Sequence, residues 1–374
     1  MKIMYVTHYS ELYGANKSLL GLIEEIKKRG ITPIIVCPKY GSFVDELIRN
    51  NIKYHVIPFK PWVGADSKIK KYIKHLINVV CSFWAWLIVI KLRVDLIHSN
   101  SSATNFGALI SKKSNIKHVW HIREFLEEDY NLKLDMGRLK ANKFIRENSD
   151  RVIYISKEIS KKYEREIPED NSRLIYNGVV PPLSYKKSSE FSNSNKTMRL
   201  VIVGILTRQK GQHEAILAIK HLKDRLNLNV ILNIVGEGPY MEELMQLVNE
   251  HNLKDEVKFL GYQSDMEKVL FNNDVALMCS ESEAFGRTTV EAMLAGLPVI
   301  GANAGATKEL IEDGATGFLY QKGNSEDLAN KIEHIYRNPI LINEVSNKAR
   351  ALALKNFTAS KNAEKVVTLY EELL

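Results

Sequence analysis

The sequence has few cysteines and no long hydrophobic run. Its three cysteines, Cys37, Cys81 and Cys279, lie far apart, and no CxxC pair or Cys/His cluster occurs. This spacing indicates neither a disulfide framework nor a metal site. The most apolar stretch, residues 76–90, has about 15 residues, fewer than the ~20 that a transmembrane helix needs. Residues 1–6 have the pattern of a buried strand rather than of a leader, and free thiols without a signal peptide favour the cytosol.

Positive charge is concentrated in the first half of the chain. Residues 1–180 contain 30 Lys and Arg against 19 Asp and Glu, a net charge of +11, and residues 181–374 contain 22 against 25, a net charge of −3. This asymmetry indicates an anionic partner for the first half, such as a membrane surface or a phosphorylated acceptor. A solvated lysine-rich surface is the alternative. Nucleic acid is not expected as a partner, because no recognisable nucleic-acid-binding motif accompanies the charge.

Short runs rich in Val and Ile alternate with longer helical patterns along the 374 residues, a length that suggests two domains. This alternation predicts parallel sheets covered on both faces. The strands expected in a first series are residues 2–6, 33–37, 54–57, 95–98, 118–121 and 152–155, and those of a second series are 199–204, 230–235, 257–260, 275–279 and 298–301. Between the two series, residues 179–197 are rich in Pro, Ser, Asn and Lys, which is typical of a linker.

The apolar segment 76–90 follows a lysine-rich stretch, residues 68–74. One interpretation is a core-facing helix of the first domain. The other is a basic helix that bears Phe83, Trp84 and Trp86 and rests on an anionic membrane surface. The sequence leaves both interpretations open.

Two glycine-rich turns follow predicted strands and precede predicted helices. The first runs from Gly204 through Arg208 and Lys210 to Gly211, and the second begins at Gly236. Such a turn presents free backbone N–H groups and the positive end of a helix dipole, and two cations add to the first turn, so a diphosphate is an expected ligand. A solvated basic loop is the alternative. Two such turns in one parallel sheet favour binding, because ligands of open α/β sheets bind at the strand ends.

Two glutamates, Glu283 and Glu291, follow the predicted strand 275–279 and lie eight positions apart, the first in a loop and the second inside a short predicted helix. Carboxylates accept hydrogen bonds from pairs of hydroxyls, so sugar or ribose hydroxyls are expected partners. Backbone N–H groups at residues 285–287 are candidates to hold phosphate oxygens. The alternative for Glu291 is a capping box with Thr288, in which the glutamate caps the start of its own helix.

These residues resemble retaining glycosyltransferases of family 4. Glu283 and Glu291 match the paired-glutamate motif of that family, Glu-x7-Glu, and Glu-Ala-Phe-Gly at residues 283–286 is its common form. The segments similar to further motifs of the family are the phosphate turn 204–211, the second glycine turn 236–239, the segment 176–179 that closes the first domain, the cleft histidine segment 120–124 and the N-terminal glycine loop 13–16.

The resemblance implies a GT-B fold, an α/β architecture of two Rossmann-like domains whose parallel sheets face each other across a cleft. The N-terminal, acceptor-side domain is expected at residues 1–178, with a C-terminal helix at 357–374 that crosses back onto it. The linker is expected at 179–197, and a nucleotide-sugar-binding domain at 198–356.

The resemblance also assigns roles to residues. By similarity, Glu283 binds hydroxyls of the donor sugar, Glu291 binds the ribose, and Lys210 neutralises the diphosphate. His121 and Gly14 face the transferring sugar and the phosphates from the first domain. The predicted catalytic residues are His121, Lys210 and Glu283, and the predicted donor-binding residues are Gly14, Gly204, Arg208, Lys210, Gly236, Glu283, Ala284, Phe285, Gly286, Arg287 and Glu291.

Two positions depart from the family pattern. Tyr13 stands where the N-terminal loop often carries the first of two glycines, which changes the approach to Gly14. Ile205 stands where the family often has an arginine directly after the glycine that matches Gly204, and Arg208 is the candidate to replace it. No aspartate pair suited to a metal-bridged phosphate occurs at either glycine turn, so we expect protein cations instead of a metal, and no other cofactor.

Cleavage of the anomeric bond leaves negative charge on the nucleotide diphosphate, and a fixed cation at that point favours the transition state. The resemblance implies retention of the anomeric configuration. If the leaving phosphate itself takes the proton of the acceptor on the same face, no general base is needed. His121 is then a candidate for orienting the sugar, and a satisfied core histidine at a strand end is the alternative.

The basic first half and the apolar segment 76–90 favour a lipid-linked or glycan acceptor at the cytoplasmic face of a membrane, as in bacterial surface polysaccharide synthesis. UDP is the nucleotide that the family resemblance leads us to expect in the donor. Three competing functions use a similar architecture: a nucleotide-sugar epimerase, a phosphorylase, and a non-catalytic nucleotide-sugar-binding subunit. The glutamate motif favours sugar transfer.

Overall fold

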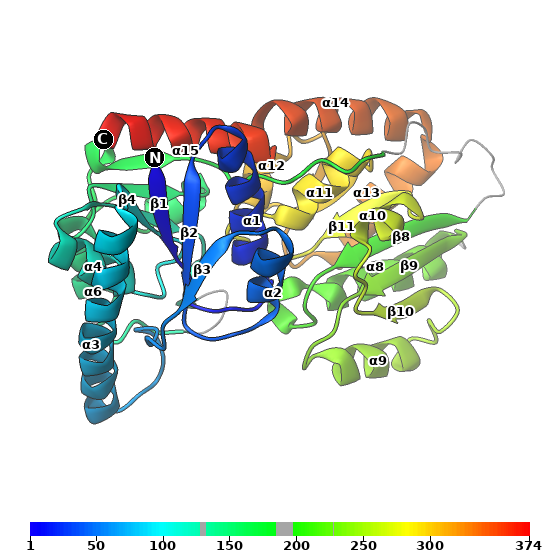
Figure 1. The fold of residues 1–374 in the computed structure, drawn as a ribbon. Coiled ribbons are helices and arrows are strands. Elements are labelled where there is room, and N and C mark those ends of the chain that lie inside the picture. The colour runs from blue at the N-terminus through cyan, green and yellow to red at the C-terminus, as the bar shows by residue number, and fades with distance from the viewer. Residues whose placement is uncertain (128–131, 185–196, 227) are drawn as a thin grey trace. The chain divides into compact units, whose positions relative to one another are not determined.

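A computed structural model describes residues 1–127, 132–184, 197–226 and 228–374 (Figure 1). It divides into two compact units, Met1–Val180 with Ala359–Leu374, and Pro181–Thr358. Each unit contains one parallel β-sheet with helices packed against it, so the predicted α/β architecture of two Rossmann-like domains is confirmed. Most of the predicted linker, residues 185–196, lies outside the described residues.

The first unit has a seven-stranded parallel sheet in the order β3-β2-β1-β4-β5-β6-β7. Its strands are β1 (Lys2–Val6), β2 (Thr32–Cys37), β3 (Lys53–Val56), β4 (Leu96–Ser99), β5 (Lys117–Ile122), β6 (Arg151–Tyr154) and β7 (Ser172–Leu174). The strand order reverses direction beside β1, between β1 and β4. Ligands of open α/β sheets bind outside the carboxyl ends of the strands at such a point.

Helices cover both faces of this sheet, because successive side chains of a strand point to opposite faces. Ile3 and Tyr5 of β1 belong to a core formed with helices on one face, and Met4 and Val6 belong to a second core on the other. The helices of the first face are α1 (Gly14–Lys28), α2 (Ser42–Arg49) and α15 (Ala359–Leu373), and those of the second are α3 (Lys68–Leu92) and α4 (Phe106–Ser114). The unit also contains, among its described residues, the helices α6 (Arg138–Glu147), α7 (Lys157–Lys161) and η1 (Glu169–Asn171).

The C-terminal helix α15 packs against α1 in the first unit (Figure 1). Gly178 makes this packing possible, because a Cβ atom there would lie 2.5 Å from the Cα of Ala359. The backbone N–H of Ala359 donates to the carbonyl of Val179, and the Asn362 side chain donates to the carbonyl of Tyr176. The last helix of the chain is therefore held by the segment that ends the first series of strands.

The second unit has a six-stranded parallel sheet in the order β10-β9-β8-β11-β12-β13. Its strands are β8 (Met198–Val203), β9 (Val230–Val235), β10 (Val257–Gly261), β11 (Val275–Met278), β12 (Val299–Ala302) and β13 (Phe318–Tyr320). Its helices are η2 (Arg208–Lys210), α8 (Gln212–Leu226), α9 (Met241–Glu250), α10 (Met266–Phe271), α11 (Arg287–Ala295), α12 (Thr307–Leu310), α13 (Ser325–Arg337) and α14 (Ile340–Asn356). The strand order reverses between β8 and β11, which makes the loops after these two strands the expected binding region.

The structure differs from the sequence prediction in two short strands and one long helix. The three-residue edge strands β7 and β13 were not predicted, because three residues carry no alternating pattern. The apolar segment 76–90 is part of α3, which has 25 residues because the lysine-rich stretch before it is also helical. Among the described helices, α3 is the one long and apolar enough to cross a membrane by length and composition.

Candidate functional site

The phosphate turn predicted at residues 204–211 joins β8 to α8 in the second unit. Gly211 has a φ of +70°, and a Cβ atom there would lie 2.0 Å from the carbonyl oxygen of Cys279. Only glycine fits this position, since both the left-handed backbone and the close approach exclude a side chain. The Gln212 side chain donates a hydrogen bond of 3.1 Å to the carbonyl of Ile205 and so fixes the shape of the turn.

The second glycine turn lies directly against the first. A Cβ atom on Gly236 would lie 2.0 Å from the carbonyl oxygen of Gly204, and a Cβ atom on Gly238 would lie 2.3 Å from that of Leu206. The Leu206 N–H also donates to the carbonyl of Glu237 at 3.0 Å. The structure therefore brings the two predicted turns together at the carboxyl ends of β8 and β9.

Lys210 and Glu283 form an ion pair, with 2.8 Å between Nζ and Oε2. Lys210 comes from the turn after β8, and Glu283 from the loop after β11, the strand beside β8. Their side chains are 31% and 16% exposed, so the pair lies at the surface of the second unit with its carboxylate more enclosed than its ammonium group. Two of the three predicted catalytic residues thus meet at the point where the strand order reverses.

A turn after β12, not singled out from the sequence, holds the Glu283 backbone. The Ala306 N–H donates to the carbonyl of Glu283 at 2.8 Å. Gly305 has a φ of +50°, and a Cβ atom there would lie 2.5 Å from the backbone nitrogen of Glu283. The only signal in the sequence was a single glycine after a predicted strand, which is common in any loop.

Glu291 pairs with Arg287 inside α11, with 2.8 Å between Nε and Oε1. The capping-box alternative is wrong, because α11 begins at Arg287 with Gly286 at its N-cap, so that Thr288 is already inside the helix. Gly286 has a φ of +90°, a left-handed conformation that favours glycine. The carboxylate of Glu291 is therefore oriented by a neighbouring guanidinium group rather than by the start of its helix.

The side chains of Ala284 and Phe285 are buried, and the Phe285 ring packs edge-on against Phe357, 6.1 Å between ring centres. The buried side chains of these two residues anchor the loop after β11. Any contact that they make with a donor would come from their backbone. Arg208, in contrast, is exposed at the surface of the first turn.

The other two predicted residues, Gly14 and His121, belong to the first unit and lie at the carboxyl ends of β1 and β5. Asn100 connects their two segments. Its side-chain N–H donates to the carbonyl of Ala15, next to Gly14, and its Oδ1 accepts from Nε of Arg123 at 2.7 Å. Gly14 is the first residue of α1 and has open space where a Cβ atom would stand.

His121 is fully buried and receives two contacts on the same ring nitrogen. Its Nδ1 lies 3.2 Å from Nη2 of Arg123 and 3.1 Å from Nε2 of His98. Burial, followed by the nearby Arg123 charge, holds the pKa of His121 well below its usual range, so the ring is neutral. A guanidinium can only donate, so Nδ1 of His121 is an acceptor and the proton sits on Nε2.

His121 is the first of four side chains joined by hydrogen bonds, and the same reasoning gives the direction of each of these bonds. Nε2 of His98 carries a proton for His121, so its Nδ1 accepts from the Tyr370 hydroxyl at 2.7 Å. The Tyr370 hydroxyl in turn accepts from the Tyr5 hydroxyl at 2.9 Å. Burial lowers the pKa of His98 and raises the pKa of both tyrosines, so all four side chains are neutral.

Nε2–H of His121 has no hydrogen-bond partner among the described residues, although its atom is buried. A buried donor left unsatisfied costs on the order of 1–3 kcal/mol. The alternative of a satisfied core histidine therefore fits only one side of the ring. The sequence did not point to His98, Tyr5 or Tyr370, because no motif surrounds them.

A second set of buried hydrogen bonds, made by Arg123 and Glu124, lies beside this series of hydrogen bonds. Arg123 donates to the side chain of Asn177, in the segment that closes the first unit. The neighbouring Glu124 accepts three hydrogen bonds on one oxygen, from the N–H and hydroxyl of Ser102 and from the hydroxyl of Ser101. Burial lowers the pKa of Arg123 to about 10, which still leaves it charged at neutral pH.

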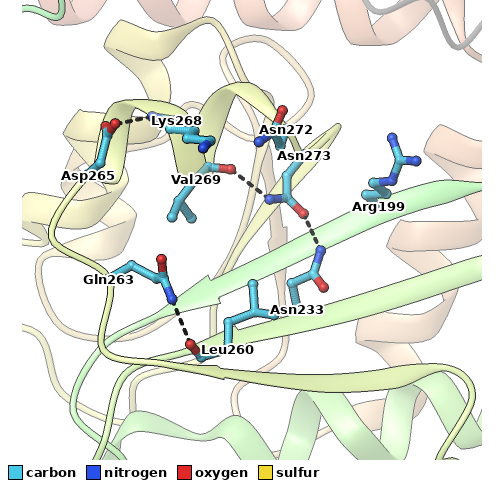
Figure 2. Close-up of a pocket in the computed structure, with 9 residues that line it drawn as sticks. All are labelled: Arg199, Asn233, Leu260, Gln263, Asp265, Lys268, Val269, Asn272 and Asn273. Atoms are coloured by element: carbon cyan, nitrogen blue, oxygen red, sulfur yellow. Dashed lines mark hydrogen bonds between the residues drawn. The ribbon is translucent and has the colours of Figure 1, made fainter.

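A hollow of about 530 Å³ in the second unit is lined by none of the predicted donor residues (Figure 2). It opens between α10 and the sheet. Figure 2 shows that two of its amide side chains satisfy each other: Asn233 donates to Asn273 at 2.8 Å, and Asn273 donates to the carbonyl of Val269 at 2.7 Å. Within the described ranges, no group of three or more acidic, histidine or cysteine side chains is arranged to hold a metal ion.

Two family models match the chain, one for each unit. The model described as Glycosyltransferase Family 4 matches residues 13–181, and the model described as Glycosyl transferases group 1 matches residues 185–352. Together they account for most of the sequence.

Named relatives and a solved structure agree with these models. N-acetyl-alpha-D-glucosaminyl L-malate synthase of Bacillus anthracis is 27% identical over 61% of this chain and 61% of that protein. The O-antigen biosynthesis glycosyltransferase WclY of Escherichia coli is 24% identical over 100% of this chain and 99% of its own. The crystal structure of HepE from Anabaena in complex with UDP-glucose superposes with a TM-score of 0.82 at 24% identity and covers 100% of both chains.

Proposed function

Because this chain is a glycosyltransferase of the GT-B type, we propose that it moves a sugar from a nucleotide-sugar, most consistently a UDP-sugar, to a hydroxyl of a glycan or lipid-linked acceptor with retention of anomeric configuration. The observation that carries the proposal is the Lys210–Glu283 pair at the carboxyl ends of β8 and β11. It sets a cation and a hydroxyl-binding carboxylate side by side, as the phosphate and the sugar of one donor require.

Lys210 neutralises the charge that develops on the leaving diphosphate, with Arg208 of the same turn as the second cation. A preorganised cation contributes mainly in the transition state, where the anomeric bond is breaking and the phosphate gains charge. The exposed position of Arg208 lets its side chain reach a bound ligand, which is the role left vacant by Ile205. Protein cations thus take the place of a metal in this proposal.

Glu283 accepts hydrogen bonds from hydroxyls of the donor sugar, and Glu291 accepts them from the ribose. Each carboxylate has a cationic partner, Lys210 or Arg287, that orients it. Backbone N–H groups at residues 285–287 hold phosphate oxygens in this proposal, and the buried side chain of Phe285 leaves its backbone as the part that can meet a ligand.

His121 contributes a neutral donor from the first unit. Its Nε2–H is free of protein partners among the described side chains and is fixed in direction by the contacts at Nδ1. A neutral donor suits a sugar hydroxyl or a ring oxygen better than it suits nucleophilic attack. The phosphate that leaves takes the proton of the acceptor hydroxyl on the face where the new bond forms, so retention needs no separate general base.

The UDP-sugar and the acceptor class rest on relatives. HepE is solved with UDP and with UDP-glucose, and WclY is named for O-antigen biosynthesis. By analogy, this chain works in bacterial surface polysaccharide synthesis, on an acceptor presented at the cytoplasmic face of the membrane.

Isothermal titration calorimetry against UDP-, GDP- and ADP-sugars tests the donor. We expect saturable binding of one or more UDP-sugars; binding of GDP- or ADP-sugars alone would contradict the base assignment. Proton NMR of the sugar released by slow donor hydrolysis then reports the anomeric configuration. Inverted product would contradict the retaining mechanism while leaving sugar transfer intact.

A further inference from the structure

Helix α3 carries its large apolar side chains outward. Its packed face consists mainly of small or polar residues: Asn78, Cys81, Ser82, Ala85 and Val89 are buried. Ile69, Leu76, Val80, Phe83, Trp84 and Leu87 are all exposed, from 40% for Leu87 to 74% for Ile69, and together they form the α3 apolar face. At 3.6 residues per turn these six positions lie within an arc of about 100° and extend for ~27 Å along the helix.

This pattern is the reverse of an ordinary surface helix, whose large apolar residues face the core. Only 28% of the most apolar part of α3 is buried. A contiguous apolar patch of this extent marks an interaction surface on a soluble domain. The interpretation of residues 76–90 as a core-facing helix holds for one side of α3, where Cys81, Ala85 and Val89 belong to the core and Ile77 and Ile88 pack against it. The α3 apolar face lies outside that core.

The inner face of α3 ties the helix along the side of the first unit. The Asn78 side chain accepts from the N–H of Lys60 at 2.7 Å and donates to its carbonyl at 2.9 Å. Lys74 is paired with Asp66 at 2.5 Å and lies 3.7 Å from Asp135. A helix that crossed a bilayer would lose these partners and would bury charge in hydrocarbon, so the arrangement suits a helix that lies on a surface.

The charged side chains of α3 and of its neighbour α4 are all positive, although Asp66 and Asp135 pair with lysines at the N-terminal end of α3. Helices α3 and α4, which pack together, contain seven lysines and no aspartate or glutamate. Lys113 of α4 lies over the ring of Phe83, 5.6 Å from its centre, and Lys112 beside it is exposed. Cations next to aromatic and aliphatic side chains are the combination that binds the headgroups and acyl boundary of anionic lipid.

We propose that the α3 apolar face docks this chain onto the surface of an anionic lipid bilayer, with Phe83 and Trp84 inserted at the acyl boundary and Lys112 and Lys113 at the lipid phosphates. A second copy of this chain is a poorer occupant, because pairing two such faces would bring lysine-bearing helices together. The N-terminal end of α3 follows β3 and runs past the end of the sheet (Figure 1), so docking brings the bilayer toward the carboxyl edge that bears Gly14 and His121. The docking does not depend on the proposed sugar transfer.

Flotation with vesicles of phosphatidylglycerol and phosphatidylcholine in equal parts tests this surface directly, without donor or acceptor. We expect the protein to float with these vesicles at low salt, less at high salt, and far less with pure phosphatidylcholine. The double change Phe83→Ser with Trp84→Ser should weaken partitioning at least about tenfold, since each large apolar side chain contributes ~1.5–3 kcal/mol when buried. Lys112→Glu with Lys113→Glu should weaken it by a similar factor and remove most of the salt dependence.

Matched controls separate docking from folding. Leu139→Ser removes an equally exposed apolar side chain from α6 of the same unit and should float like the parent protein. Trp84→Phe should also float, but should lose the part of the tryptophan quenching by brominated lipid that Trp84 supplies. The proposal is overturned if the parent protein does not float at low salt, if the serine variants float undiminished, or if sedimentation shows a dimer that the serine variants abolish.

Discussion

The ammonium group of Lys210 lies 2.8 Å from the carboxylate of Glu283, although 73 positions separate the two residues in the chain. The pair exists because β8 and β11 are neighbours in the sheet while β9 and β10 lie on the other side of β8. The loops that follow these two strands begin at the same edge of the sheet, so the cation of one loop lies beside the carboxylate of the other.

Lys210→Ala should lower kcat by roughly 100-fold to 1000-fold, because in the proposed mechanism Lys210 is the cation that stabilises charge developing in the transition state. The melting temperature should change little, since a partly exposed ion pair contributes at most ~1 kcal/mol. Steady-state kinetics and thermal unfolding measure both. Lys322→Ala, a change of an exposed lysine elsewhere in the second unit, is the control. Unchanged turnover in Lys210→Ala would remove the diphosphate argument.

Glu283→Gln should impair donor use more than it impairs stability. The amide keeps one acceptor oxygen but loses the charge that pairs with Lys210, so hydroxyl binding weakens and the cation is less well placed. Calorimetric donor affinity should fall about tenfold, as for a loss of ~1.4 kcal/mol. A lower melting temperature with unchanged donor affinity would instead make Glu283 a structural residue.

Tyr370→Phe should change the hydrogen bonding of His121 through the intervening side chain of His98. The change leaves Nδ1 of His98 without its donor and the Tyr5 hydroxyl without its acceptor, a cost of about 1–3 kcal/mol in stability. Nitrogen-15 NMR of labelled histidine should report a change in the hydrogen-bonding of the His98 and His121 rings. Tyr5→Phe removes only the outermost donor and should leave the histidine signals nearly unchanged; equal spectra for both variants would break the proposed order of hydrogens.

Stability should fall as the pH drops from 6.5 to about 4. His98, His118 and His121 are buried, and burial lowers the pKa of each; that of His118 falls to about 4. The unfolded chain, with histidine pKa values near 6.5, therefore binds more protons than the native state in this window, so stability rises with pH. Each histidine contributes up to ~1.4 kcal/mol per pH unit to the slope of stability against pH, so the three together contribute up to about 4 kcal/mol per pH unit. Urea unfolding at several pH values measures this slope, and His118→Gln should reduce it. A flat profile would contradict the burial of neutral rings.

Gly211→Ala should destabilise the second unit strongly and distort the backbone of the turn at residues 204–211. A Cβ atom there meets the Cys279 carbonyl at 2.0 Å in addition to the cost of a left-handed backbone. Gly314→Ala is a matched control, since Gly314 has a similar φ of +74° but open space around it. We expect ~1 kcal/mol for the control and about 1–3 kcal/mol more for Gly211→Ala. Equal unfolding free energies for the two variants would show that the close approach is relieved elsewhere.

Local patterns in the sequence were enough for most of the fold. Alternating apolar strands and helical segments predicted two parallel α/β units, and all eleven of the short runs that were assigned as strands match an observed strand to within one residue at each end. Such patterns depend on the backbone period and on burial of one face, which neighbouring residues encode. The edge strands β7 and β13 were missed, because three residues are too few to show an alternating pattern.

The sequence by itself also determined which residue types could meet a nucleotide-sugar, through two glycine turns and two glutamates at fixed spacing. Only the tertiary structure decided which of them touch. Strand order places Lys210 against Glu283, and the return of α15 onto the first unit brings Tyr370 to His98, 272 positions away. The direction of α3 was likewise undecided, because hydropathy counts apolar residues but packing determines which side of a helix the core accepts: here small residues face inward, and Phe83 and Trp84 are left at the surface.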